Sequence, residues 1–265
     1  MKPGFLYTRQ DIPSYQCPRC SIGQIEPDMQ SLRTRQTGES VSLGKQEYWE
    51  ESFHRELLTV NTKCSNENCK EVGTMVMHGE LHPQNDEADE CVYFTPVYIN
   101  PAPAVFKVEK SYPNDVSMLC RSAFHLFWVD PAACGNKIRA AVERLLDDQG
   151  IEKTITDRAG TPQLSKKGYP QPVSLNKRLK AFKTKGKVQS QCFDALDSIR
   201  WLGNSSSHVS LDTDKYSVFK SLVILKSVLE AIYLGRKIPD SMDYEVARVN
   251  VLYHPDKQRS WPKKI

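Results

Sequence analysis

The sequence lacks the apolar runs that would place the chain in a membrane. Its first residues, Met1–Tyr7, have no apolar core of the kind found in signal peptides, and no apolar run approaches the length that spans a bilayer. The formal net charge is only +4 over 265 residues, so the overall balance favours no class of partner. We expect a cytoplasmic protein that does not bind membranes.

Three catalytic signatures are also missing. The sequence has no Gly-rich phosphate loop, no cluster of carboxylates suited to magnesium and no nucleophile elbow. Nucleotide hydrolysis and serine or cysteine hydrolase chemistry are therefore unsupported. The composition, with 39% hydrophobic and 26% charged residues, is that of a globular chain long enough for two modest domains.

Cysteine, by contrast, is present in a pattern. Four of the eight cysteines form two close pairs: Cys17, Cys20, Cys64 and Cys69. In a reducing compartment, paired cysteines are more often metal ligands than disulfides, and four thiolates in two pairs suit tetrahedral zinc. We therefore predict a closed, structural zinc site in a zinc-ribbon-like β module with a long insertion. The alternative is four unrelated buried cysteines, which is how we interpret the four that stand alone.

The periodicity of apolar residues changes from strand-like to helical near residue 110. Val92–Ile99 has strand composition, and Pro96 within it indicates an edge strand or a bend. Helical spacing begins after Tyr112, and Asp130-Pro131 reads as the N-cap and first residue of a second helix. Further patterns predict a short helix that begins near Ser174, a helix from about Val188 to Leu202, and a helix from about Asp212 to Leu234.

These patterns predict an α+β chain in three parts. We assign residues 1–110 to the β module, 111–240 to an α-helical bundle and 241–265 to a basic C-terminal tail.

A basic segment lies within the predicted bundle. From Lys166 to Lys187 the chain carries eight cations and no acid, with Tyr169 and Phe182 between them. Cations can bind phosphates and aromatic rings can stack on bases, so we predict a nucleic-acid-binding surface. The alternative is an ordinary solvated helix face. The predicted contacts are Lys177, Arg178, Lys180, Lys183, Lys185 and Lys187.

A second cluster of polar residues lies near the end of the fourth predicted helix. On a continuous helix Arg200, Asn204 and His208 would share one face, although Arg200 and His208 would then be about 12 Å apart along the axis. A break at Gly203, or a second subunit, could bring them together. The alternative is structural: Arg200 would pair with an acid such as Asp197 or Glu143, and the other two would cap helix ends.

The order of these parts resembles a bacterial domain family of unknown function, DUF4145. The resemblance rests on the two cysteine pairs, Tyr112-Pro113, the helix Arg139–Leu146, Ile199-Arg200, Gly203-Asn204 and His208. That family is in turn similar to the HEPN superfamily of helical bundles. The resemblance therefore implies a HEPN-like bundle behind the zinc ribbon, a homodimer, and metal-independent RNA cleavage in a toxin-type or anti-phage defence system.

The same resemblance implies catalytic roles for Arg200, Asn204 and His208. His208 would act as general acid or base, Arg200 would stabilise charge on the phosphate, and Asn204 would orient either group. The spacing departs from the HEPN pattern, in which four to six residues separate the arginine from the histidine, because seven separate them here.

Two functional hypotheses follow. The first is an RNA-binding or RNA-cleaving effector, with RNA a better candidate than DNA. The second is a non-catalytic zinc-binding adaptor or nucleic-acid-binding subunit of a defence or restriction complex.

Overall fold

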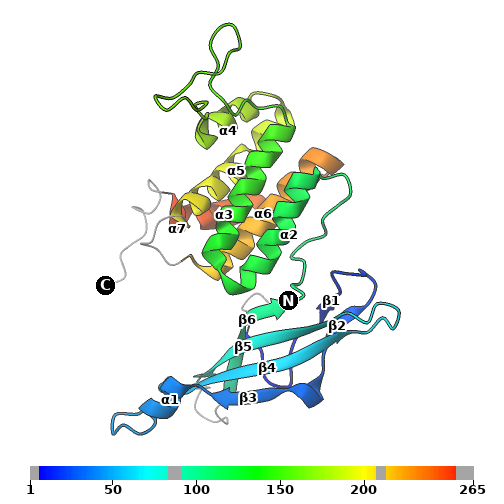
Figure 1. Cartoon of the computed structure of the whole chain (residues 1–265), viewed down its shortest axis with the longest axis vertical. Helices are drawn as coiled ribbons and strands as arrows, with labels where there is room; N and C mark the ends of the chain where they lie inside the picture. The colour runs from blue at the N-terminus through cyan, green and yellow to red at the C-terminus, as the bar shows by residue number, and fades with distance from the viewer. Residues whose placement is uncertain (1–5, 83–90, 207–212, 255–265) are drawn as a thin grey trace. The chain divides into compact units, whose positions relative to one another are not determined.

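The computed structural model describes residues 6–82, 91–206 and 213–254. The chain divides into two compact units, Met1–Ala104 and Val105–Ile265, which we call the sheet unit and the helical unit (Figure 1). The fold is therefore mixed α+β, with an antiparallel sheet followed by helices, in agreement with the predicted class.

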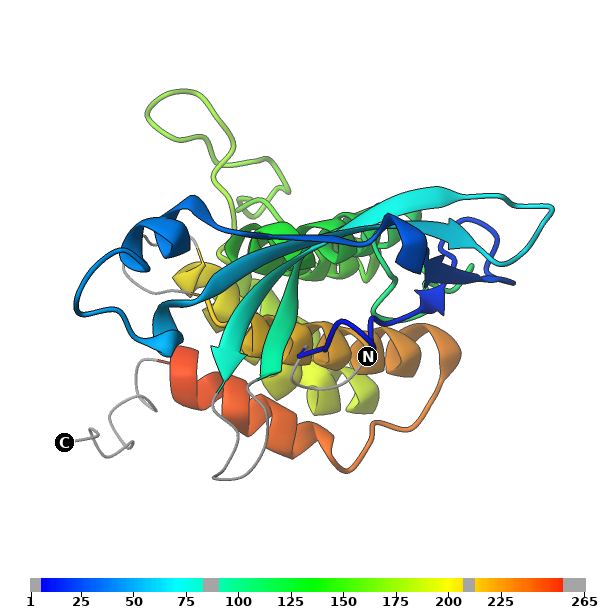
Figure 2. The ribbon, with the colours of Figure 1, turned by 90° about the horizontal axis from the view of Figure 1, so that it is seen from below.

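The sheet unit is built on one antiparallel sheet of six strands, in the order β1-β2-β4-β5-β6, with β3 paired to β4. Figure 2 shows that the strands fan and curl. Three short helices lie between β2 and β4: η1 (Met29–Ser31), α1 (Gly38–Leu43) and η2 (Glu51–Phe53). The strands are β1 (Tyr15–Gln16), β2 (Gln24–Pro27), β3 (Arg33–Gln36), β4 (Arg55–Cys64), β5 (Val72–His82) and β6 (Cys91–Asn100).

Strand β4 is the centre of this sheet because it pairs with three strands, β2, β3 and β5. Along its second half every other residue is buried, which is the period of a strand with one face in a core. The buried residues are Leu58, Val60, Thr62 and Cys64. At the end of the strand order, Pro96 of β6 lies opposite Met77, beside a shift in register. The edge strand, one of the two alternatives predicted from Pro96, is confirmed, and the register shift is an irregularity next to the proline.

The described residues of the helical unit form six α-helices. They are α2 (Asn114–Val129), α3 (Pro131–Asp148), α4 (Leu175–Lys183), α5 (Lys187–Ser205), α6 (Lys215–Leu234) and α7 (Met242–Tyr253). α3 packs against α2, α5 and α6, and α5 also packs against α4 and α7. Asp130 caps α3 as predicted, because its side chain accepts a hydrogen bond from the backbone N–H of Ala133 over 2.8 Å.

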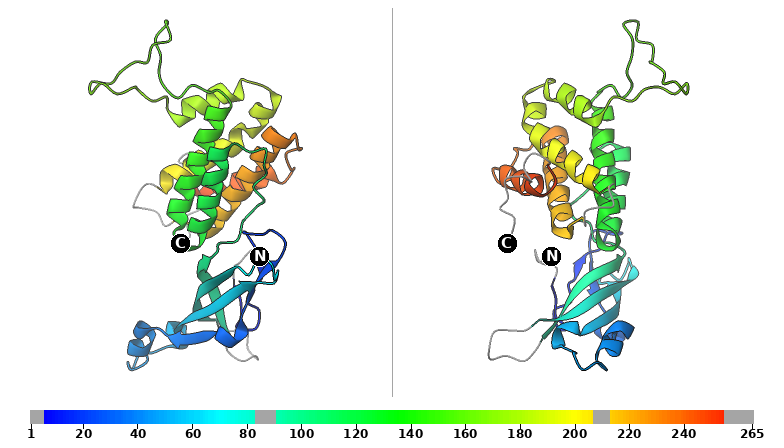
Figure 3. Two further views of the ribbon diagram at one scale, coloured as in Figure 1. Left: turned by 45° about the vertical axis from the view of Figure 1, so that its right-hand side comes forward. Right: turned by 90° about the vertical axis from the view of Figure 1, so that its left-hand side faces the viewer.

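Two features of the helical unit were not predicted. The first is α7, which lies in the segment that we assigned to the basic tail; its buried residues are Met242, Val246, Val249, Asn250 and Tyr253. The basic residues of that tail, from 255 onward, lie outside the described part of the chain. The second is an extended arm, residues 152–173, between α3 and α4. Isolated bridges such as Thr154 to Pro172 hold its two sides together, and both views of Figure 3 show it projecting beyond α4.

Candidate metal centre and basic surface

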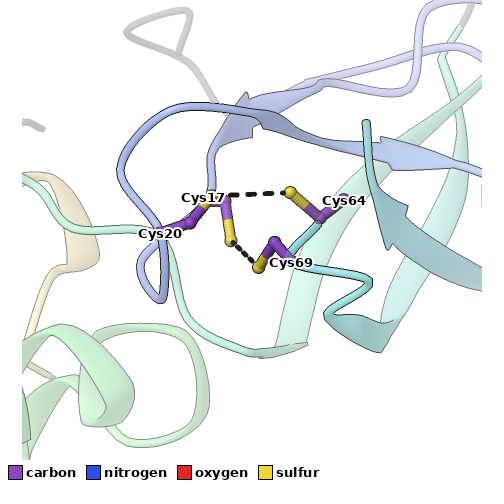
Figure 4. Close-up of side chains that lie close together, drawn as sticks. All are labelled: Cys17, Cys20, Cys64 and Cys69. Atoms are coloured by element: carbon purple, nitrogen blue, oxygen red, sulfur yellow. Dashed lines mark hydrogen bonds between the residues drawn. The ribbon is translucent and has the colours of Figure 1, made fainter. Parts of the chain in front are cut away.

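The four paired cysteines converge on one point in the sheet unit. Cys17 and Cys20 lie on the turn between β1 and β2, whereas Cys64 ends β4 and Cys69 lies on the turn between β4 and β5. β2 pairs with β4 so that Ile25 faces Cys64, and this pairing places both turns at the same end of the sheet. All four sulfur atoms lie within 4.8 Å of one another (Figure 4). The predicted cluster is therefore confirmed.

The two turns have similar backbone geometry. In each, the residue after the second cysteine is left-handed, with φ 55° at Ser21 and 53° at Lys70. Each turn also aims a backbone N–H at a sulfur atom: Gly23 donates to Cys20 and Asn66 to Cys64, both over 3.4 Å. Such N–H···S bonds stabilise negative charge on sulfur. Both turns are thus built to hold thiolates.

Gly23 is the residue that lets the two turns approach each other. A Cβ atom at this position would lie 2.7 Å from the Cys64 sulfur and 2.7 Å from the Asn66 nitrogen, well inside van der Waals contact. Only glycine fits there without moving the second turn.

The sulfur spacing fits a tetrahedral metal ion. A Zn–S bond of about 2.3 Å and tetrahedral angles require sulfur atoms roughly 3.8 Å apart. The two pairs that join the turns, Cys17 with Cys69 and Cys20 with Cys64, are separated by 3.8 Å and 3.7 Å. The backbone amides of Gly23 and Ile22 lower the pKa of Cys20 to about 6, whereas burial raises the pKa of Cys64 to about 12. A bound cation would favour the ionised form of Cys64.

The lone cysteines of the helical unit are buried thiols, as predicted. Cys120, Cys134 and Cys192 are all fully buried. Burial raises the pKa of each, to about 12 for Cys120 and Cys134 and to about 11 for Cys192. They are therefore neutral at physiological pH and contribute to packing.

The predicted nucleic-acid contacts divide into two groups. Five of the six are exposed lysines on α4, the turn after it and the start of α5: Lys177, Lys180, Lys183, Lys185 and Lys187. Lys183 lies over the ring of Phe193, and Lys185 donates to the backbone carbonyl of Gln149 at the end of α3. Within the described residues, the side chains of Lys177, Lys180 and Lys187 form no hydrogen bond or ion pair, and all three are exposed to solvent.

Arg178 is different from the exposed lysines. Its side chain is only 6% exposed, and it pairs with Asp147 of α3 over 2.6 Å. The reason is helical geometry: Arg178 lies beside Leu175, Leu179 and Phe182 on the buried face of α4. The structure places it in the core, along with Phe182, which we had considered as a stacking residue. Tyr169 near the tip of the arm is 70% exposed.

The predicted catalytic residues are held by partners inside the helical unit. Arg200 donates to Asp197 over 2.7 Å, and its guanidinium lies 4.1 Å from the centre of the Trp201 ring. Its side chain is 11% exposed. The side-chain oxygen Oδ1 of Asn204 accepts a hydrogen bond from Arg139 of α3. His208 lies outside the described residues.

Gly203 does not break α5, which continues to Ser205. Its role is to provide space, because a Cβ atom there would lie 2.7 Å from the Cβ of Arg139 and 2.8 Å from its Cδ. The Arg139 side chain therefore passes Gly203 and reaches Asn204 of α5, while its Nε also pairs with Glu143 one turn further along α3. A larger residue at position 203 would separate α3 from α5.

Fold and site together define a mixed α+β chain with a four-cysteine cluster that could hold a metal ion and a lysine-rich surface on its helices. Residues 121–258, just over half of the chain, match the family model described as domain of unknown function DUF4145. The chain belongs to this family. Residues 6–100 match a second model, domain of unknown function DUF8608. No curated protein and no solved structure matches the chain. In the described parts, every helix is too short or too polar to cross a membrane.

Proposed function

We propose that the protein is a zinc-stabilised RNA-binding protein that contacts the RNA backbone through the exposed lysines of α4 and the start of α5. The observation that carries this proposal is the charge of one continuous stretch. From Arg158 to Phe193 the sequence contains nine cations and no carboxylate. Phosphate groups are the natural counterions of such a surface.

Several features support RNA as the partner. Tyr169 is exposed close to Lys166 and Lys167 on the arm, so one segment offers both a stacking surface and cations. Unstacked bases are accessible in single-stranded RNA, which makes it the better ligand for an exposed ring. The helix packing is also compatible with the HEPN-like bundle that the family resemblance implies, and HEPN proteins commonly act on RNA.

We propose zinc as the metal of the four-cysteine site. Four thiolates at tetrahedral spacing form the ligand set that structural zinc prefers, and they leave no position open for a substrate. The metal would link the turns of two hairpins, in the manner of a zinc ribbon. Its role would be to fold the sheet unit.

The proposed activity is binding without cleavage. Arg200 is mostly buried and already bonded to Asp197, so it offers a phosphate few accessible donors. Asn204 is similarly engaged by Arg139. These contacts favour a structural role for both residues. That the protein forms a homodimer, or binds other proteins of a defence complex, remains a prediction from the family resemblance.

Substitution of the three unpartnered lysines tests the binding surface. We expect Lys177→Gln, Lys180→Gln and Lys187→Gln together to weaken binding of a mixed-sequence single-stranded RNA by roughly tenfold or more at about 50 mM salt. The slope of log affinity against log salt should fall by about 2, because each lost phosphate contact removes about 0.7. Fluorescence anisotropy measures both quantities.

The matched control replaces three exposed lysines elsewhere, Lys45, Lys63 and Lys110, by glutamine. It removes the same charge from the chain and should change affinity by less than about twofold. Equal losses in the two variants would indicate only a general charge effect and contradict the proposed surface.

Incubation of labelled RNA with the wild-type protein in magnesium-free buffer tests catalysis. We expect intact RNA on a denaturing gel, because Arg200 is committed to Asp197 and Trp201. Cleavage that both Arg200→Gln and His208→Ala abolish, with unchanged folding, would overturn this expectation and establish a metal-independent ribonuclease.

A further inference from the structure

A pocket of about 500 Å³ opens in the helical unit, outside the lysine surface and the Arg200 region. Residues of α3, the first turn of α4 and the base of the arm line it. Its volume falls within the range of sites that bind small molecules. Its walls combine positive charge with rigid apolar surface, which suits a ligand that has both an anionic group and an apolar group.

Four cations line the pocket against two carboxylates. The cations are Arg139, Arg144, Lys153 and Arg178, and the carboxylates are Glu143 and Asp147. The lining therefore carries two more positive than negative charges. An anionic ligand would balance this excess.

Asp147 fixes two of these arginines in place. One of its carboxylate oxygens accepts from Arg178 over 2.6 Å, and the other accepts from Arg144 over 2.9 Å. A guanidinium has five N–H donors, so each arginine keeps donors beyond those that Asp147 uses. Arginines that are already oriented can bind a phosphate with little loss of side-chain entropy.

Arg178 is unusual among the lining residues because its charged side chain is almost completely buried. Its side chain is 6% exposed, and it is held by Asp147 and by the backbone carbonyl of Ile151. Among the residues that the structure describes, its Nε has no hydrogen-bond partner. A buried charged donor without a partner is costly, and such groups are enriched at sites that bind a ligand.

The first turn of α4 adds to the positive potential. Ser174, the N-cap of α4, and Leu175 both line the pocket, so the helix begins at its wall. Backbone N–H groups at a helix N-terminus favour anions. The remaining wall is apolar and stiff, since Pro170, Pro172 and Val173 form it. Flat apolar groups such as nucleobases can pack against this kind of surface.

We propose that this pocket binds a 5′-nucleoside monophosphate, with the phosphate against the exposed Arg144 and Lys153 and the base against Pro170 and Pro172, while the buried charge of Arg178 adds to the positive potential behind them. Inorganic phosphate alone would fill a small part of 500 Å³ and leave the apolar wall unused. The ligand could be a free nucleotide or the 5′-phosphorylated end of an RNA chain, because both present the same group. The proposal does not depend on the lysine surface.

Calorimetric titration of the full-length protein with adenosine 5′-monophosphate tests the pocket. We expect saturable binding, at least about tenfold tighter than that of adenosine or inorganic phosphate. The combination Arg144→Gln and Lys153→Gln should weaken it about tenfold or more. Both side chains are exposed, so the variant should fold. A matched control, Arg121→Gln with Lys137→Gln, removes one exposed arginine and one exposed lysine outside the pocket and should bind like the wild type.

RNA oligonucleotides with and without a 5′-phosphate identify the source of the ligand. A preference for the phosphorylated end that is lost in the Arg144 and Lys153 variant would support the pocket and assign it to RNA. Binding of the mononucleotide without such a preference would support the pocket and assign it to a free nucleotide. No binding of the mononucleotide and no end preference, or binding that the pocket variant leaves unchanged, would overturn the proposal.

Failure of the lysine surface can be distinguished from failure of the pocket. Substitution of Lys177, Lys180 and Lys187 should weaken the binding of RNA with or without a 5′-phosphate. It should leave the binding of the mononucleotide unchanged. The Arg144 and Lys153 variant, in contrast, should weaken the binding of the mononucleotide.

Discussion

If the four-cysteine cluster holds zinc as proposed, replacing Cys64 by serine should abolish metal binding and unfold the sheet unit. Cys64 is the last residue of β4, where it pairs with Ile25 of β2, and its sulfur joins the two turns across 3.7 Å to Cys20. Structural zinc contributes on the order of 10 kcal/mol to the folding of small zinc modules. Loss of one of four ligands removes most of that free energy, and a hydroxyl is a poor ligand for zinc.

The measurements are metal content by mass spectrometry and thermal unfolding by circular dichroism. Wild-type protein should contain one zinc ion per chain, and Cys64→Ser should contain almost none and lose the unfolding transition of its strands. Cys192→Ala is the matched control, because Cys192 is a buried thiol of the helical unit that lies outside the cluster. A Cys64→Ser protein that retains its zinc and its unfolding transition would show that the cluster is not a metal site.

Local sequence patterns predicted those features that depend on residues close together in the chain. The cysteine pairs identified the cluster because each pair lies on a single turn. Helical periodicity identified α2 to α6, and Asp130-Pro131 identified the start of α3, because a cap is a contact within one turn. The DUF4145 resemblance was confirmed over residues 121–258. The long insertion between the cysteine pairs was predicted, but no comparable signal indicated β3 and α1 within it. The arm was not indicated by such a signal either.

Contacts between distant residues could not be predicted from such patterns. Arg178 stands in a run of lysines and looks like one of them; only its pairing with Asp147, 31 residues earlier, places it in the core. For Arg200 the sequence offered Asp197 and Glu143 as partners. The structure pairs Arg200 with Asp197 on its own helix, and Glu143 with Arg139 one turn earlier on α3.

The helix α7 was missed for a different reason. Its apolar residues Val246, Val249 and Tyr253 have helical spacing, but they stand beside a basic C-terminal segment whose composition suggested a tail. Periodicity should have outweighed composition there, since a stripe over three turns is the stronger signal.

Replacing Asp147 by alanine should destabilise the helical unit by about 3 kcal/mol. Asp147 is the acid that pairs with the buried guanidinium of Arg178, and it also accepts a hydrogen bond from Arg144. Without it, Arg178 keeps only the carbonyl of Ile151 as a partner in the described residues, and its positive charge stays buried in the core between α3 and α4. An unpaired buried charge costs more than the pair itself contributes, so the loss should exceed that of a surface salt bridge.

Urea unfolding followed by tryptophan fluorescence measures this loss. Asp148→Ala is the matched control, because the neighbouring Asp148 is exposed and accepts hydrogen bonds only from the neutral side chains of Tyr233 and Gln149 in the described residues. It should cost less than about 1 kcal/mol. The double variant Asp147→Ala with Arg178→Met should recover much of the stability, since it removes the orphaned charge as well as its partner. Equal losses of unfolding free energy for Asp147→Ala and Asp148→Ala would mean that Arg178 is not buried in the core. Arg178 would then again be a candidate contact of the RNA-binding surface.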